Sequence, residues 1–182
     1  MIKIFYFTFL LYMLVSSATI LHSQDVLIQS DSMKLDNGSC SANGEWKLYK
    51  RNNGTGFVKL IFKGKKSGHT GTGYTRFHFV IANANMQPVF IKEQTLTMGA
   101  SATKGIVRKR HEENVGIPIG MLDNIVNGTF VIWFSVSANE SGILPSLNSM
   151  LDWSYKEFKD IIFNRTMEFE YQGVKIKTTK LR

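Results

Sequence analysis

Residues 50–62 read KRNNGTGFVKLIF, and this stretch decides how the chain folds. Asn53-Gly54 lies between two runs in which apolar and polar residues alternate, which is a strong signal for a β-hairpin. Before the turn, Trp46 and Leu48 occupy alternate positions; after it, apolar residues again occupy every second position, with lysines among the intervening ones. A period of two with lysines on one face predicts an antiparallel hairpin that is half in solvent.

The same alternation recurs along the chain and predicts a strand-rich fold. Residues 129–137, TFVIWFSVS, differ because both faces are apolar, which predicts a central strand covered on both sides. The other expected strands cover residues 25–35, 75–81, 88–98 and, as a hairpin, 167–178. Residues 99–128 have mixed periodicity and dense charge; we expect them to be functional or to contain a further strand.

One segment has the spacing of a helix. From Ser146, apolar residues recur on one stripe for about 16 residues, after Pro145 at the entry. We expect this helix to pack across an edge or face of a sheet, and the alternative is a membrane-bound amphipathic helix with Trp153 and Tyr155 as interfacial anchors. The expected fold class is therefore mainly β: an antiparallel β-sandwich or open barrel with one accessory amphipathic helix near the C-terminus.

The first residues are typical of an export signal. Lys3 precedes an apolar run from Ile4 to Val15, and small residues follow, which predicts cleavage after Ala18 or Ser23. The run is shorter than the roughly 20 residues that a spanning helix needs. We expect a signal peptide at 1–23, a single β-rich domain at 24–182 without a transmembrane anchor, and a secreted, extracellular protein (periplasmic in a bacterium).

Cys40 is the single cysteine, so no intramolecular disulfide supports the fold. We interpret it as an incidental loop or small core residue; the functional alternatives are intermolecular pairing and a reactive thiol.

Positive charge is the main functional signal. The net charge is +8, and residues 24–182 carry +7 because Lys3 is the only charged residue before them. Basic residues cluster at 47–66, 104–110 and 175–182. Such surfaces attract anionic partners. Export makes nucleic acid an unsuitable partner, which leaves an acidic glycan, an anionic lipid surface or an acidic protein.

Two of these regions supply the candidate binding residues. The loop GKKSGHTGTGY at 64–74 combines glycines, which let a backbone approach a ligand closely, with cationic and aromatic side chains. The candidates are Lys65, Lys66, His69, Tyr74, Arg108, Lys109 and Arg110.

Signatures of catalysis are missing from the sequence. No two histidines have metal-ligand spacing, Ser101 lacks the spacing of a nucleophile elbow, and Lys65 lacks the leading glycine of a phosphate-binding loop. We therefore predict no cofactor, no metal and a secreted non-enzymatic binding domain with a basic surface. The alternatives are a membrane-active pore-forming or lytic toxin, and a small secreted hydrolase with a site around His69, His78 or His111.

Five asparagines stand in glycan-acceptor sequons, each at the boundary of an expected element. In a host that glycosylates exported proteins they are candidate attachment sites, and in a bacterium they are only turns. These asparagines are Asn37, Asn53, Asn127, Asn139 and Asn164.

Overall fold

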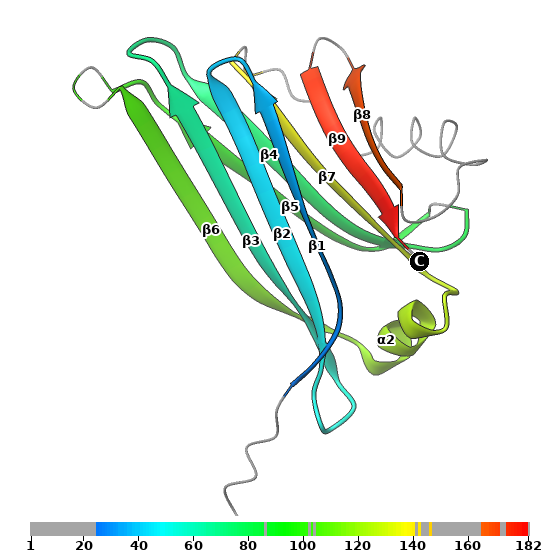
Figure 1. Ribbon diagram of the computed structural model, residues 1–182. Helices are drawn as coiled ribbons and strands as arrows, with labels where there is room; N and C mark the ends of the chain where they lie inside the picture. The colour runs from blue at the N-terminus through cyan, green and yellow to red at the C-terminus, as the bar shows by residue number, and fades with distance from the viewer. Residues whose placement is uncertain are drawn as a thin grey trace, which may run out of the picture.

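A computed structural model shows two antiparallel β-sheets and one short helix (Figure 1). It describes residues 25–85, 87–101, 103, 105–140, 142, 146, 165–171 and 174–181. The elements are β1 (Val26–Asn37), β2 (Cys40–Lys50), β3 (Gly56–Ser67), β4 (Gly73–Ala82), β5 (Pro88–Met98), β6 (Ile106–Ile117), α2 (Ile119–Val126), β7 (Val131–Asn139), β8 (Arg165–Tyr171) and β9 (Val174–Leu181).

The strands form two separate sheets, which we name the four-stranded and the five-stranded sheet. Their strand orders are β1-β2-β3-β6 and β5-β4-β7-β9-β8, and every neighbouring pair is antiparallel. The predicted mainly β, antiparallel fold is confirmed, and because the sheets do not close into one barrel, the arrangement is that of a sandwich.

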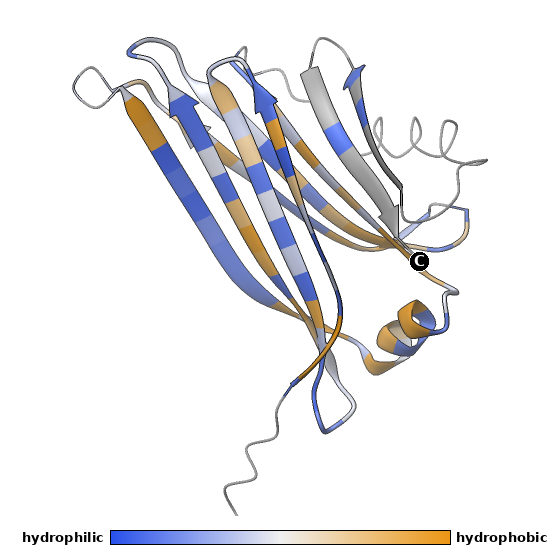
Figure 2. Cartoon of the chain, in the orientation of Figure 1, coloured by the Kyte–Doolittle hydropathy of each residue, from blue (hydrophilic) through white to orange (hydrophobic). Residues whose placement is uncertain are grey.

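The alternation in the sequence explains how the sheets pack. In β2 every even-numbered residue from Cys40 to Leu48 is buried, and the odd-numbered residues between them are partly exposed. Figure 2 shows this alternation of hydrophilic and hydrophobic residues along β2 and β3. The buried faces meet between the sheets, where Trp46 lies against Phe79 and the ring of Phe62 stacks on Phe77, with centroids 5.4 and 4.6 Å apart.

Residues 99–128 contain both a strand and the helix of the described chain. β6 is the further strand that their mixed periodicity left open, and its charged residues belong to an edge strand of the four-stranded sheet. Helix α2 was not predicted; it buries Leu122 and Ile125 at one end of the sandwich. Among the described residues, no helix is long and apolar enough to cross a membrane. The helix predicted from Ser146, with Trp153 and Tyr155, lies outside them.

The prediction for residues 129–137 is confirmed. β7 is the third strand of the five-stranded sheet, and all eight residues from Val131 to Ala138 are buried, including those that face away from the sandwich core. Trp133 and Ser135 on that outer side have no solvent-exposed surface.

The turn at Asn53-Gly54 joins β2 and β3 as predicted, although its loop is longer than a two-residue turn. β2 ends at Lys50 and β3 begins at Gly56. The Oδ1 of Asn53 accepts hydrogen bonds from the backbone N–H and hydroxyl of Thr55, at 3.0 and 2.6 Å, and Gly54 adopts a φ of +81°. The Asn side chain thus replaces a backbone partner, and glycine supplies the left-handed conformation.

Candidate functional site

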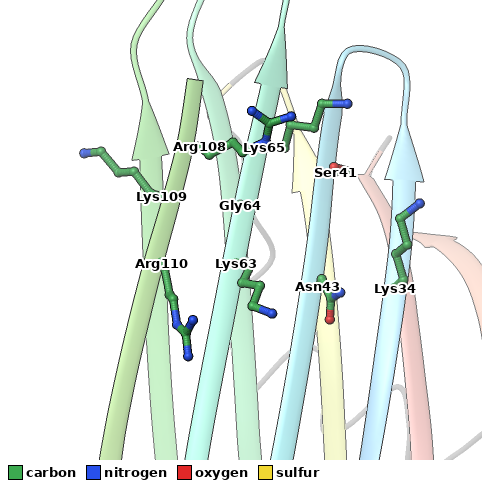
Figure 3. A pocket seen from close by; sticks show the side chains of 9 residues that line it. All are labelled: Lys34, Ser41, Asn43, Lys63, Gly64, Lys65, Arg108, Lys109 and Arg110. Carbon is green, nitrogen blue, oxygen red and sulfur yellow. The ribbon is translucent and has the colours of Figure 1, made fainter. Parts of the chain in front are cut away.

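The solvent face of the four-stranded sheet carries a groove of about 450 Å³ that is lined mainly by cations, and we name it the basic groove (Figure 3). It lies near the end of the sandwich where β3 ends and β6 begins. Its lining residues are Lys34, Ser41, Asn43, Lys63, Gly64, Lys65, Arg108, Lys109 and Arg110.

The strand register brings these side chains together from four strands. Side chains opposite one another on neighbouring strands of a sheet share a face and lie about 5 Å apart. One such row, which we name the Arg108 row, consists of Asp36, Ser41, Lys65 and Arg108. The next, the Arg110 row, consists of Lys34, Asn43, Lys63 and Arg110. Each row therefore places a lysine of β3 directly opposite an arginine of β6.

Most of these cations lack an acidic neighbour. Lys34 pairs with Asp36 at 2.7 Å and Arg110 pairs with Glu112. Within the described residues, no ion pair involves the other cations that line the groove, Lys63, Lys65, Arg108 and Lys109. The basic groove therefore carries an uncompensated positive charge. This charge costs stability, because like charges directly opposite each other in a sheet are destabilising.

The row that follows along the strands is balanced instead. This Glu112 row consists of Ser32, Glu45, Ile61 and Glu112. Lys59 and Lys47, on the same face, pair with Glu112 at 2.7 Å and Glu45 at 2.8 Å. Hydrogen bonds from Lys59 and Arg110 hold the pKa of Glu112 below its ordinary value, so its carboxylate is charged and limits the positive field on this side.

The structure divides the predicted binding residues into two sets. Lys65, Arg108, Lys109 and Arg110 all line the basic groove, although Lys109 extends away from the other cations there (Figure 3). His69 lies in the exposed loop between β3 and β4, and Tyr74 lies in β4 of the five-stranded sheet, so neither lines the groove.

Lys66 differs from Lys65 because successive side chains of a strand point to opposite faces. It is buried, and its Nζ donates to the hydroxyl of Ser39 and, at 2.9 Å, to the carbonyl of Ser67. Glu140, after β7, lies 3.7 Å away. Hydrogen bonds from Ser39 hold the pKa of Glu140 below its ordinary value. Lys66 therefore joins the two sheets and does not line the groove.

Sequence reasoning missed Lys34, Ser41, Asn43 and Lys63 as groove residues. Lys63 could have been predicted from the sequence, because Lys63 stands two positions before Lys65 and the two side chains therefore share a face of the strand. Lys34 could have been predicted from the tight connection between β1 and β2. This connection pairs Asn37 with Cys40, and the register then sets Lys34 opposite Asn43. The third basic cluster does not join the groove: Lys175, Lys177 and Lys180 belong to β9 of the other sheet.

A second polar cluster lies on the outer side of the five-stranded sheet. His78 Nδ1 lies 3.1 Å from the Ser135 hydroxyl and His78 Nε2 lies 3.1 Å from a Glu93 oxygen. Burial lowers the pKa of His78, and the bond to Glu93 opposes this only in part, so the ring is neutral. The hydroxyl of Ser135 then donates to Nδ1, while Nε2–H donates to Glu93.

Serine, histidine and a carboxylate also form a serine hydrolase triad, but there Nε2 faces the serine and Nδ1–H the carboxylate, whereas here the two ring nitrogens are exchanged. The surroundings differ as well. Ser135 and His78 have no solvent-exposed surface, so a substrate has no route to the hydroxyl in this structure. Ser135 also lies in the middle of β7, which is hydrogen-bonded to β4 and β9 on its two sides. Those ladders use the backbone N–H groups that an oxyanion hole would need. We interpret the cluster as a buried network that fixes the register of β4, β5 and β7.

The surroundings of Cys40 are also those of a residue that supports the fold. Cys40 is buried, packs over Gly73, and burial raises the pKa of its thiol, which disfavours the reactive thiolate. Among the described residues, no group of three histidine, cysteine, aspartate or glutamate side chains could hold a metal ion.

The sequons differ in how their asparagines are used. Asn53 and Asn127 are exposed, and their Oδ1 atoms accept bonds from the Thr two positions on. Asn37 is partly buried, and its Nδ2 donates to the carbonyl of Ala138 at 2.7 Å. Asn139 is half-buried at the end of β7, and Asn164 lies outside the described residues.

Compared with protein-family models, with curated proteins and with solved structures, the chain gives no match.

Proposed function

We propose that this chain is an exported, non-enzymatic binding domain that takes up an anionic partner in the basic groove. The observation that carries the proposal is that Lys63 lies opposite Arg110 and Lys65 lies opposite Arg108. Within the described residues, only Arg110 of these four has an acidic partner, Glu112. An anionic ligand would supply the missing negative charge. Arginine adds a planar fork of donors that matches carboxylate and sulfate oxygens.

Dextran sulfate, a polyanion without a defined shape, tests the proposal against simple attraction by net charge. The variant Lys63→Ser/Lys65→Ser removes two charges from the groove, and Lys47→Ser/Lys59→Ser removes two from the same face outside it. We expect the first to weaken binding about tenfold and the second to weaken it much less, since two surface contacts are worth roughly 1–2 kcal/mol. Equal losses in both variants would mean that binding follows net charge and not the groove.

Salt dependence provides a second readout. Contacts between exposed charges are screened as the Debye length falls from about 10 Å at 0.1 M salt to about 3 Å at 1 M. We expect dextran sulfate to bind the wild type strongly at low salt and to dissociate at high salt. Binding that persists unchanged at 1 M sodium chloride would contradict the proposal.

Export is part of the proposal and rests on the N-terminal pattern. If residues 1–23 are a signal, the protein recovered from the medium or periplasm begins at Gln24, or at Thr19 after the earlier cleavage. N-terminal sequencing of the exported protein distinguishes these outcomes from an uncleaved chain, which would contradict this part.

A further inference from the structure

We infer that the ligand of the basic groove is a linear acidic polysaccharide, with sulfate or carboxylate groups, that runs across the strands from β6 to β1. This inference rests on the proposed function and adds the class of ligand and its direction on the sheet. Three features of the described residues carry it: the extent of the positive charge, the acidic row beside it, and the chemical character of its lining.

The positive charge extends across the sheet more than along it. In the Arg110 row, cations stand on β6, β3 and β1, with the amide of Asn43 on β2 between Lys63 and Lys34. Neighbouring strands lie about 4.8 Å apart, so this row spans about 14 Å. Along the strands, the two cationic rows are only two residues apart, or about 7 Å.

The Glu112 row limits the positive charge in the direction along the strands. Glu45 and Glu112 follow directly after Asn43 and Arg110 along their strands, at the next positions on the same face. An anionic chain that ran along the strands would therefore meet carboxylates after two cationic rows. A chain that crosses the strands avoids Glu45 and Glu112 and can contact β6, β3 and β1 in turn. At the β1 end, the carboxylate of Asp36 is paired with Lys34.

The lining favours a sugar polymer over a protein. Among its nine residues there is no aromatic or large apolar side chain, whereas protein interfaces place such side chains at their centre. What the groove offers is charge together with the hydroxyl of Ser41 and the amide of Asn43. These groups suit a ligand whose recognition elements are acidic groups and hydroxyls.

The neighbouring connections disfavour a membrane surface. Peripheral membrane proteins combine basic residues with large apolar side chains that enter the bilayer. Three connections at this end of the sandwich, residues 38–39, 68–72 and 99–105, contain in the sequence only Gly, Ala, Ser, Thr, His69 and Lys104. The connection after β7 also begins at this end, and most of it lies outside the described residues. Of the exposed apolar residues, Ile106 begins β6 at this end, whereas Ile119 and Val126 belong to α2 at the opposite end (Figure 1).

Heparin oligosaccharides of defined length test the inference, with titration calorimetry as the measurement. We expect affinity to rise from the disaccharide until the oligosaccharide spans β6 to β1, and then to level off per site. Lys34→Ser, at the β1 end of the groove, should weaken the longer oligosaccharides several-fold and change the disaccharide by less than about twofold, because only the longer ones reach it. The matched control is Lys47→Ser, on the neighbouring strand outside the groove, which should change neither.

Two further probes separate this inference from the proposed function. Vesicles of phosphatidylcholine with phosphatidylserine, and a polyglutamate peptide, present negative charge in other forms. If either binds the wild type as tightly as the long oligosaccharides, and Lys63→Ser/Lys65→Ser still weakens it, the polysaccharide inference is overturned while the groove remains an anion site. An affinity independent of oligosaccharide length overturns it as well. If no probe responds to Lys63→Ser/Lys65→Ser, the proposed function itself fails.

Discussion

Lys65 of β3 and Arg108 of β6 lie directly opposite each other on the solvent face of the four-stranded sheet, and neither has an acidic partner among the described residues. Lys63 and Arg110 repeat this cross-strand pairing two positions away, although Arg110 also pairs with Glu112. A sheet that served only stability would place opposite charges at such positions. Stability and binding should therefore respond in opposite directions to changes here.

Lys65→Glu should stabilise the protein while it weakens anion binding. The substitution turns a repulsive cross-strand pair into an attractive one, which is worth about 0.2–1 kcal/mol in a sheet. Urea unfolding at low salt measures the gain, and it should shrink at high salt because the pair is exposed. Lys50→Glu is the control with the same charge change: Lys50 lies opposite Val26 and Gly56, so no cross-strand charge pair is altered and stability should change less. A loss of stability in Lys65→Glu at low salt would contradict the assigned pairing.

Gly44→Ala should destabilise the sandwich by about 1–3 kcal/mol, the usual cost of overpacking a core. Gly44 faces the other sheet, and a Cβ there would overlap the ring of Phe134 and lie 3.2 Å from Phe77. Gly116→Ala is the matched control, because Gly116 is an exposed residue of β6 with open space around its Cβ position. Denaturant unfolding of both variants makes the comparison, and equal stability of the two would show that the sheets are further apart than described.

The buried network of His78 should make stability depend on acidity. Burial lowers the pKa of His78 in the folded state, whereas in the unfolded chain it titrates near its ordinary value of 6.5. Below that pH the unfolded state binds a proton that the folded state excludes, so stability falls as the pH drops from about 6.5, by up to about 1.4 kcal/mol per pH unit. The pKa of Glu93 is lowered chiefly by its bond with His78, so it adds a further loss at lower pH, below its ordinary value of 4.5.

His78→Gln should remove the part of this dependence that begins near pH 6.5, as measured by the free energy of unfolding across pH 4.5 to 8. His69→Gln, in an exposed loop, should leave the dependence in place. Ser135→Ala keeps the buried imidazole and should keep the pH dependence even if it lowers stability throughout. An unchanged profile in His78→Gln would assign the acid sensitivity to other groups.

Asn53 and Asn127 should be the occupied sequons among the described ones when the protein is expressed in a host that glycosylates. Asn37 uses its Nδ2 to bind the Ala138 carbonyl and lies half-buried between the sheets, so folding competes with a glycan there. Mass spectrometry of peptides before and after glycosidase treatment gives the occupancy. A predominantly glycosylated Asn37 in folded protein would contradict the contact.

A glycan on Asn53 would leave the basic groove open. Asn53 lies in the turn before Gly56, and Lys63 stands seven residues further along β3, at a distance of about 23 Å. Dextran sulfate should therefore bind glycosylated and deglycosylated protein alike. Binding that appears only after deglycosylation would place the anion site nearer to the turn.

The local half of the candidate site could be predicted from the sequence. Alternation in residues 56–67 assigns Lys63 and Lys65 to the solvent face and Lys66 to the interior, because side chains of a strand alternate between faces. Lys65 and Lys66 therefore belong to β3 and not to a loop, and their side chains point to opposite faces of the sheet.

The spacing of apolar residues is enough to predict half-exposed strands and one strand covered on both faces, since burial follows that spacing. The pairing of β6 with β3 cannot be read from it and is seen in the tertiary structure alone. Two strands of the other sheet, β4 and β5, separate them in the chain, and such long-range pairing depends on which apolar faces can be buried together. That pairing sets Arg108 beside Lys65 and Arg110 beside Lys63, and so creates the basic groove.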